Sequence, residues 1–271
     1  MQYACEQVSL PLCSVLFKNR VHAKYSGRAV QMGRVNLYSP YTLILLTIVL
    51  WLNLLLVERT RRLYSFPARK EIMLFLRMYS GVVLFDLLLS AGVVKRSWTL
   101  IYATVVSLQL SFFVGSFVAA LCSGLVWMLP NRMSSFCSSI SRSVTFGSFL
   151  AALAPIFLCI LFSFGFGIFI ILYIVPAVCS FFFMIAQFAK LAQLNLEIWS
   201  YGSVFITAGL VLLIAATPYI LGMVIVLVSD RYLDGVFLMH ALGFLAVLKV
   251  YNLWMIDNEK EIENVNTVQK W

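Results

Sequence analysis

Between Tyr201 and Val228 the chain reads YGSVFITAGLVLLIAATPYILGMVIVLV, a stretch without a single acidic or basic side chain. A helix needs roughly 20 apolar residues to cross the hydrocarbon core of a bilayer, so this stretch can span a membrane with some tilt. The run is continuous and lacks the alternation of a transmembrane β-strand. It therefore predicts a transmembrane helix.

Six similar runs flank this stretch and fill most of the remaining chain. We predict seven transmembrane helices, with the approximate limits Tyr41 to Val57, Glu71 to Val94, Trp98 to Met128, Val144 to Phe164, Ile168 to Phe188, Tyr201 to Val228 and Tyr232 to Met255. The expected fold class is all-α, a polytopic membrane protein built as a bundle of seven transmembrane helices. The membrane domain covers residues 41–255, between an amino-terminal tail (residues 1–40) and an acidic tail (residues 256–271).

The composition excludes a soluble protein, because 62% of the 271 residues are hydrophobic and only 11% are charged. The net charge of +9 would suit a nucleic-acid binder, but the basic residues are scattered and no polar domain presents them. We read them as topology signals. The basic residues near helix ends favour a cytosolic carboxyl terminus and an amino terminus in the lumen or outside. Ten lie on the predicted cytosolic side: Arg59, Arg61, Arg62, Arg69, Lys70, Arg132, Arg142, Lys190, Lys260 and Lys270. Six lie on the opposite side: Lys24, Arg28, Arg34, Lys95, Arg96 and Arg231.

Two charged residues interrupt the second run. Arg77 and Asp86 are nine residues apart, which places them on opposite faces of a straight helix, so they cannot pair. Arg77 is near enough to the cytosolic end to reach the headgroups. Asp86 lies deeper, where a carboxylate costs roughly 2.5 to 3.5 kcal/mol on insertion scales. We expect a functional or interhelical Asp86, or a protonated or hydrogen-bonded carboxyl facing Ser, Thr, Gln109 or Gln187.

The third run carries a face of small residues. They recur every four positions and are Ser107, Ser111, Gly115, Ala119 and Ser123. In lipid, helices associate through close van der Waals packing, which small residues permit. This face indicates a helix contact, either within the same bundle or with the helix of a partner protein.

The six cysteines divide by position. Three fall in apolar runs, as small packing residues: Cys122, Cys159 and Cys179. Cys137 falls in the Ser-rich stretch 134–143, which we predict to be a cytosolic loop. Only Cys5 and Cys13 lie in the amino-terminal tail, where an oxidising space would let them close a disulfide loop. The alternative to this disulfide is that Cys5 and Cys13 both remain free thiols.

The sequence indicates no catalytic, metal or cofactor site. The sequence shows no paired carboxylates, nucleophile elbow or phosphate-binding loop, and His22 and His240 lie in no ligand cluster, so we predict no enzyme, no metal and no cofactor. The internal repeats typical of transporters are not evident. Pro155, Pro176 and Pro218 predict kinks in the fourth, fifth and sixth helices.

Several stretches, in order along the chain, resemble one known family. They are CEQVSLPLCSV from Cys5 to Val15, Ala68-Arg69-Lys70-Glu71, Gly92-Val93-Val94, Leu172-Tyr173-Ile174-Val175 and Tyr232-Leu233-Asp234-Gly235. In the last helix the resemblance continues to Trp254. The series resembles the fungal chitin synthase export chaperones. The chain differs from the family in its shorter amino-terminal region and in having Ser90, rather than an acidic residue, shortly before Gly92. It is similar to a short, divergent member.

The resemblance implies a seven-helix protein of the endoplasmic reticulum membrane, with a lumenal amino terminus and a cytosolic tail. Its implied partners are a chitin synthase catalytic subunit and membrane lipid, with no nucleic acid; the particular client and the oligomeric state stay open. We hypothesise that Asp86, Ser111, Gly115, Ala119 and Ser123 contribute to a client surface. The alternatives are a seven-helix receptor or sensor, and then a small-molecule transporter.

The motif that opens the last helix has a structural interpretation. Asp234 precedes the predicted helix, where a carboxylate can accept hydrogen bonds from free amides and complement the helix dipole. We therefore expect Tyr232, Leu233, Asp234 and Gly235 to serve the fold first.

Overall fold

The computed structural model describes residues 5, 11–16, 30–32, 35–37, 39–64, 66, 68–94, 98–127, 131–193 and 198–268. Seven helices in these ranges are long and apolar enough to cross a membrane, which confirms the predicted number and fold class. The spans are Pro40–Arg62, Arg69–Ser90, Thr99–Trp127, Cys137–Leu161, Gly165–Gln193, Ser200–Val228 and Gly235–Ile256.

The first four spans and the last are single helices, whereas the fifth and sixth are composite. The single ones are α3 (Pro40–Arg62), α4 (Arg69–Ser90), α5 (Thr99–Trp127), α6 (Asn131–Leu161) and α11 (Gly235–Val268). The fifth comprises α7 (Gly165–Phe169), the π-helix η1 (Ile170–Ile174) and α8 (Val175–Gln193). The sixth comprises α9 (Ile198–Ala216), the π-helix η2 (Thr217–Leu221) and α10 (Gly222–Val228).

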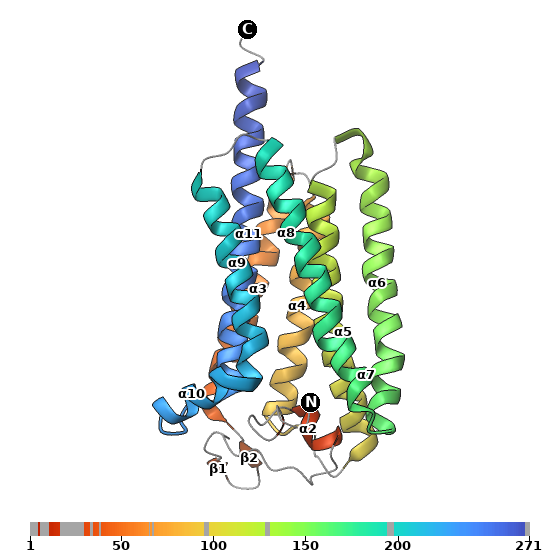
Figure 1. Ribbon diagram of the computed structural model, residues 1–271, viewed down its shortest axis with the longest axis vertical. Coiled ribbons are helices and arrows are strands. Elements are labelled where there is room, and N and C mark those ends of the chain that lie inside the picture. Colours follow the sequence, from red (N-terminus) through yellow and green to blue (C-terminus); the bar gives the residue numbers. More distant parts are fainter. Residues whose placement is uncertain are drawn as a thin grey trace.

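Helix α5 lies at the centre of one half of the bundle, with α4, α6 and α8 packed against it. In the other half, α3 packs on α4, and α11 packs on α9 and α3 (Figure 1). Short helix α2 (Pro11–Leu16) and the hairpin of β1 (Val30–Met32) and β2 (Val35–Leu37) lie at the end opposite the carboxyl terminus. The two termini of the membrane domain therefore lie at opposite ends, as an odd number of spans requires.

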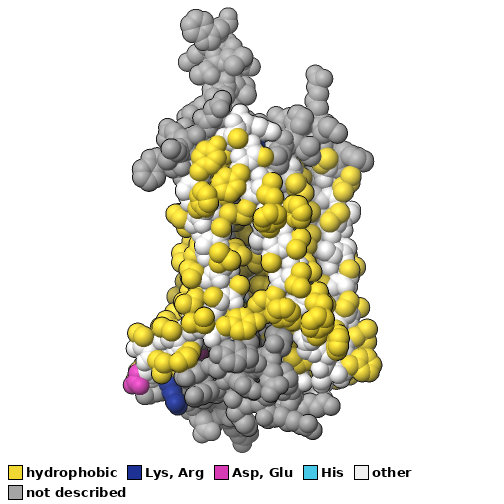
Figure 2. All heavy atoms as spheres, viewed as in Figure 1, with side chains coloured by type: hydrophobic (Ala, Val, Ile, Leu, Met, Phe, Trp, Pro, Cys, Tyr) yellow, Lys and Arg dark blue, Asp and Glu magenta, His cyan; other side chains and the backbone are white. Residues whose placement is uncertain are grey.

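Hydrophobic side chains cover the outside of the bundle as well as its core. Phe205, Leu212 and Ile220 are at least 65% exposed, and Figure 2 shows such side chains spread over the middle of one face. Inside, one apolar cluster joins α3, α4 and α11, and another joins α2, α5 and α6. A surface of this kind is stable only where lipid replaces water around the helices.

The Ser-rich stretch 134–143 is helical, so the prediction of a loop there was wrong. Helix α6 begins at Asn131, and Cys137 is a half-buried residue within it. Ser138 and Ser141 are buried, and Arg142 Nε donates a hydrogen bond to the Ser138 carbonyl at 3.3 Å. A serine-rich sequence has weak helix propensity, which burial of one helical face can override.

Two of the three helix-interrupting prolines coincide with π-helical turns. Pro176 is the second residue after η1, and Pro218 lies inside η2. Proline cannot donate the hydrogen bond of a regular turn and its ring crowds the preceding carbonyl, so a wider turn accommodates it. Pro155 lies inside α6, which continues as an α-helix. The two π-helices pack together through Tyr173 and Tyr219, whose ring centroids are 6.0 Å apart.

The last helix does not end at the predicted membrane boundary. Helix α11 runs from Gly235 to Val268 and therefore includes most of the segment 256–271 that the sequence suggested as a separate tail. In Figure 1 its end projects beyond the bundle. The acidic segment is thus an extension of the seventh span.

Candidate functional site

One buried polar cluster of the bundle is built around Asp86. Its side chain is 1% exposed, and its Oδ2 atom accepts a hydrogen bond from Gln109 Nε2 on α5 at 2.9 Å. His240 on α11 places Nε2 at 2.9 Å from the same oxygen, although the ring is not aligned for a regular hydrogen bond. Tyr79, about two turns before Asp86 on the same face of α4, keeps a buried hydroxyl without a hydrogen-bond partner. Three helices are therefore joined through one carboxyl group.

The structure shows which of the partners considered for Asp86 contacts its carboxyl group. Of the two glutamines considered as partners, Gln109 bonds to it, whereas both amide atoms of Gln187 are buried without a partner. Arg77 lies on another face and points to the Met73 sulfur at 3.6 Å. Asp86 is thus an interhelical residue in this structure, enclosed by its own bundle.

The small-residue face of α5 is also turned inward. Ser107, Ser111, Ala119 and Ser123 are at most 1% exposed, and Gly115 is buried. A Cβ atom on Gly115 would lie 3.6 Å from Phe149 on α6 and 3.8 Å from Met78 on α4. The face allows α4 and α6 to approach α5 closely. A client helix would reach it only if one of these neighbours moved away.

The serines of this face are satisfied within their own helix. Ser107 and Ser111 donate to the carbonyls of Ala103 and Ser107, four residues back, at 2.7 and 2.6 Å. Ser123 donates to the Ala120 carbonyl at 2.7 Å. Because their hydrogen bonds are used locally, these side chains offer close packing rather than polar contacts to a neighbouring helix.

A second set of polar groups lies near the opposite end of α4. Glu71 is 2% exposed and its Oε1 atom has no hydrogen-bond partner. The Cys122 thiol on α5 is close to this carboxyl and to the hydroxyls of Ser141 and Thr145 on α6. Neither hydroxyl forms an aligned hydrogen bond. Buried polar groups without partners cost roughly 1–3 kcal/mol each, so this end of the bundle is less well satisfied than the Asp86 cluster.

The Tyr232-Leu233-Asp234-Gly235 motif connects the first span to the last. Asp234 precedes α11, and its Oδ1 atom accepts hydrogen bonds from the Phe237 amide at 2.7 Å and from Thr42 Oγ1 on α3 at 3.0 Å. Tyr232 packs edge-on against Tyr41, with ring centroids 5.9 Å apart. The carboxylate therefore caps one helix and binds the start of another.

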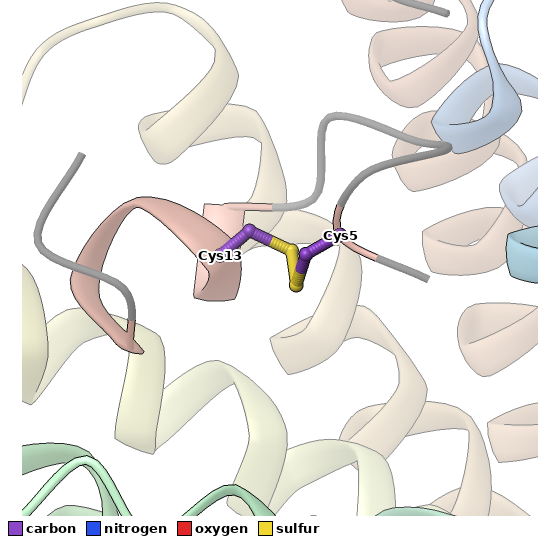
Figure 3. Close-up of a disulfide and its surroundings, with 2 residues drawn as sticks. All are labelled: Cys5 and Cys13. Atoms are coloured by element: carbon purple, nitrogen blue, oxygen red, sulfur yellow. A yellow bond between two sulfur atoms is a disulfide. The ribbon is translucent and has the colours of Figure 1, made fainter. Parts of the chain in front are cut away.

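A disulfide joins Cys5 to Cys13, with Cα atoms 5.5 Å apart (Figure 3). It holds α2, whose Leu12 and Leu16 are buried in the apolar cluster formed with α5 and α6. Of the other cysteines, the four that the structure describes carry free thiols. The bridge thus belongs to a small covalently closed cap over one end of α5 and α6.

Sequence reasoning missed two polar residues that connect helices. His240 was considered only as a metal ligand, and it instead faces Asp86. Asn53 on α3 donates to the Leu76 carbonyl at 2.8 Å and to Ser80 Oγ at 2.7 Å, both on α4. Each is a lone polar residue inside an apolar run, which is itself a signal of an interhelical bond. In the part of the chain that the structure describes, no group of three metal-ligating side chains occurs.

Comparison with known proteins gives one consistent family. The family model described as chitin synthase export chaperone matches residues 1–267. Proteins with that same name include one from Gibberella zeae, 24% identical over 96% of this chain and 81% of its own length. One from Cryptococcus neoformans var. neoformans is 28% identical over 96% and 74%, and one from Emericella nidulans is 28% identical over 96% and 82%. No solved structure matches the chain significantly.

These matches confirm the resemblance seen in the sequence. Because the family model covers all but the last few residues, the chain belongs to the chitin synthase export chaperone family.

Proposed function

We propose that this chain is a membrane chaperone of the endoplasmic reticulum that binds a chitin synthase catalytic subunit and allows its folding and export to the cell surface. The observation that carries the proposal is the family match over residues 1–267, which includes every membrane span. The names of the relatives supply the client class.

The architecture supports a role based on helix contacts. A polytopic client exposes polar groups to lipid until its own helices assemble, at roughly 2.5 to 3.5 kcal/mol for a charged group. A partner that consists of membrane helices can cover such groups during assembly. Because Asp86 and the small-residue face of α5 are enclosed, client contact in our proposal uses outward-facing positions of the bundle.

Two outward positions allow the proposed client contact to be examined without disturbing the core. A Cβ atom added at Gly147 on α6 or at Gly209 on α9 meets no atom within 4 Å. Leu at either position should leave the protein's own accumulation unchanged. Loss of client co-purification with only one of them would identify the helix that contacts the client, and α6 and α9 lie in different halves of the bundle.

We further propose that the amino terminus is lumenal and the carboxyl terminus cytosolic. The basic residues at the ends of α3 and α4, together with the disulfide in the opposite tail, support this orientation. The chain has no Asn-x-Ser/Thr sequence, so an acceptor site engineered at the amino terminus would be glycosylated only if that tail is lumenal.

Deletion of the gene tests the function directly. We expect a chitin synthase to be retained in the endoplasmic reticulum and wall chitin to fall, with both restored by the intact gene. Normal synthase localisation in the deletion strain would contradict the proposal and would favour a receptor-like role. Co-purification of the tagged chain with the retained synthase would distinguish direct binding from an indirect effect on export.

A further inference from the structure

Basic side chains are concentrated where α3 ends and α4 begins, a segment that we call the basic hairpin (residues 58–70). Five of its residues are basic: Arg59, Arg61, Arg62, Arg69 and Lys70. Four of them are exposed, and Arg69 is half-buried. The next two connections at this end of the bundle have fewer, with two basic residues in 128–142 and one in 189–200. The concentration in one hairpin is therefore more than a topology signal spread over the connections would supply.

Most of this positive charge is not neutralised by neighbouring carboxylates. Glu58 is the one exposed acidic residue among the described residues of α3 and α4. Its carboxylate oxygens lie 3.4 Å from Arg62 Nε and 3.9 Å from Arg61 Nη1, so it is shared between two guanidinium groups. Within the described part of the chain, the remaining three form no ion pair: Arg59, Arg69 and Lys70.

Other acidic residues near this end face elsewhere. Glu71, the next residue after the basic hairpin, is 2% exposed and close to the Cys122 thiol inside the bundle. The acidic residues of α11 come after the seventh span, which ends at Ile256, on the part of the helix that projects beyond the bundle (Figure 1). The chain therefore carries them away from the ends of α3 and α4.

The basic hairpin is held in place before any ligand binds. The ring of Phe66 packs edge-on against Trp254 of α11, with centroids 5.6 Å apart. Arg69 Nη1 donates a hydrogen bond to the Arg61 carbonyl at 3.2 Å, and its guanidinium lies 4.7 Å from the centre of the Tyr64 ring. A guanidinium has five N–H donors, so Arg69 keeps others for a ligand. Because its position is already fixed, less side-chain entropy is lost on binding.

An exposed apolar face of α3 leads directly to these cations. At 100° per residue, four apolar side chains of α3 fall within about 60° of one another on the helix, and Arg62 continues the same face at its end. The four are 48–61% exposed: Ile44, Ile48, Trp51 and Leu55. A ligand on this face meets hydrocarbon along the helix and positive charge at its end. That combination matches a lipid with an anionic headgroup, whereas a soluble anion would use only the charged part.

We propose that the basic hairpin binds an anionic phospholipid, whose phosphate is held by the arginines while its acyl chains lie along the exposed face of α3. Arginine binds phosphate oxygens through paired N–H donors, and basic clusters at the ends of membrane helices attract anionic headgroups. The site goes beyond the proposed chaperone role and does not depend on the identity of the client.

The test uses the purified full-length chain in detergent, with added lipid counted by native mass spectrometry. Phosphatidylserine should bind more tightly than phosphatidylcholine, which has the same phosphate but no net charge, and the difference should shrink as ionic strength rises. Replacing three arginines together (Arg59→Gln, Arg62→Gln and Arg69→Gln) should weaken phosphatidylserine binding by about 100-fold. A matched control removes three charges elsewhere (Arg142→Gln, Lys190→Gln and Arg231→Gln) and should bind as the unmodified protein does.

A second variant gives a change of opposite sign, which damage to the fold would not produce. Glu58→Gln frees Arg61 and Arg62 from their shared carboxylate and should tighten phosphatidylserine binding by about fivefold. Because Glu58 is exposed, this variant also provides the test if the triple variant fails to fold.

Four outcomes would overturn the proposal. They are equal binding of the two lipids, an equal loss in the matched control, weaker binding in Glu58→Gln, and displacement of the lipid by an equal concentration of glycerophosphoserine. The last compound is the headgroup without acyl chains, so its success would show a site for soluble phosphate compounds rather than for lipid.

Discussion

Nε2 of His240 on α11 lies 2.9 Å from Oδ2 of Asp86 on α4, so the last membrane helix is joined to the second through a buried pair. Asp86→Ala should lower the free energy of unfolding by about 3 kcal/mol, because it leaves the Gln109 amide without its acceptor and the buried His240 side chain without the carboxyl group that it faces. Thermal or denaturant unfolding of the purified protein measures this loss.

A double-mutant cycle shows whether the two residues act together. The combined Asp86→Ala and His240→Ala protein should lose less stability than the sum of the losses in the two single variants. Each single variant leaves one buried side chain without its partner, whereas the double variant removes both side chains. Glu58→Ala, which removes an exposed pair with Arg62 at 3.4 Å, is a suitable control and should cost less than about 1 kcal/mol. Additive effects at Asp86 and His240 would mean that they are not coupled.

Asp234→Ala should destabilise the protein by about 1 kcal/mol, because the Phe237 amide loses its cap and Thr42 loses its acceptor. Asp234→Asn retains an oxygen acceptor and should recover most of this loss. The thermal midpoint provides the measurement. If Asp234→Ala reduced client export while its own stability stayed unchanged, the motif would serve the client rather than the fold.

Two glycines give opposite predictions for the same substitution. Gly124→Ala should destabilise the bundle by about 1–3 kcal/mol, since its Cβ atom would lie 2.8 Å from the Phe183 ring on α8. Gly147→Ala meets no atom within 4 Å and should be neutral or stabilising by up to about 1 kcal/mol. Thermal stability in detergent distinguishes them. Phe183→Leu should relieve the effect at Gly124, and a Gly124→Ala protein of normal stability would contradict the packing.

The sequence predicted the fold through its apolar runs, because a membrane span must satisfy its backbone hydrogen bonds internally and a long apolar run leaves only a helix to do so. It failed at the Ser-rich start of α6, which is helical although its composition is typical of a loop. The helical state there depends on continuity with the fourth span and, at Ser138 and Ser141, on burial against the bundle.

The identity of the residues that contact a buried polar group was harder to predict than the existence of such a contact. The depth of Asp86 indicated a partner, and Gln109 was among those considered, yet His240 was not. A contact between α4 and α11 depends on how seven helices are arranged, which periodicity along one helix does not encode. The inward direction of the Gly115 and Ala119 face has the same origin, because small residues indicate a contact without naming the helix that makes it.

The Cys5 and Cys13 bridge leads to a prediction about the amino-terminal cap. Alkylation of the unfolded, unreduced protein should modify only the four cysteines with free thiols, whereas prior reduction should add Cys5 and Cys13. Mass spectrometry counts the modified sites. Cys5→Ser should lower stability by about 2.5 kcal/mol on the loop-entropy model for a closed loop of this length. The double Cys5→Ser and Cys13→Ser variant should lose no more than Cys5→Ser alone, because either change opens the same loop. Modification of all six cysteines without reduction would show that the cap is held by the packing of Leu12 and Leu16 rather than by a covalent bond.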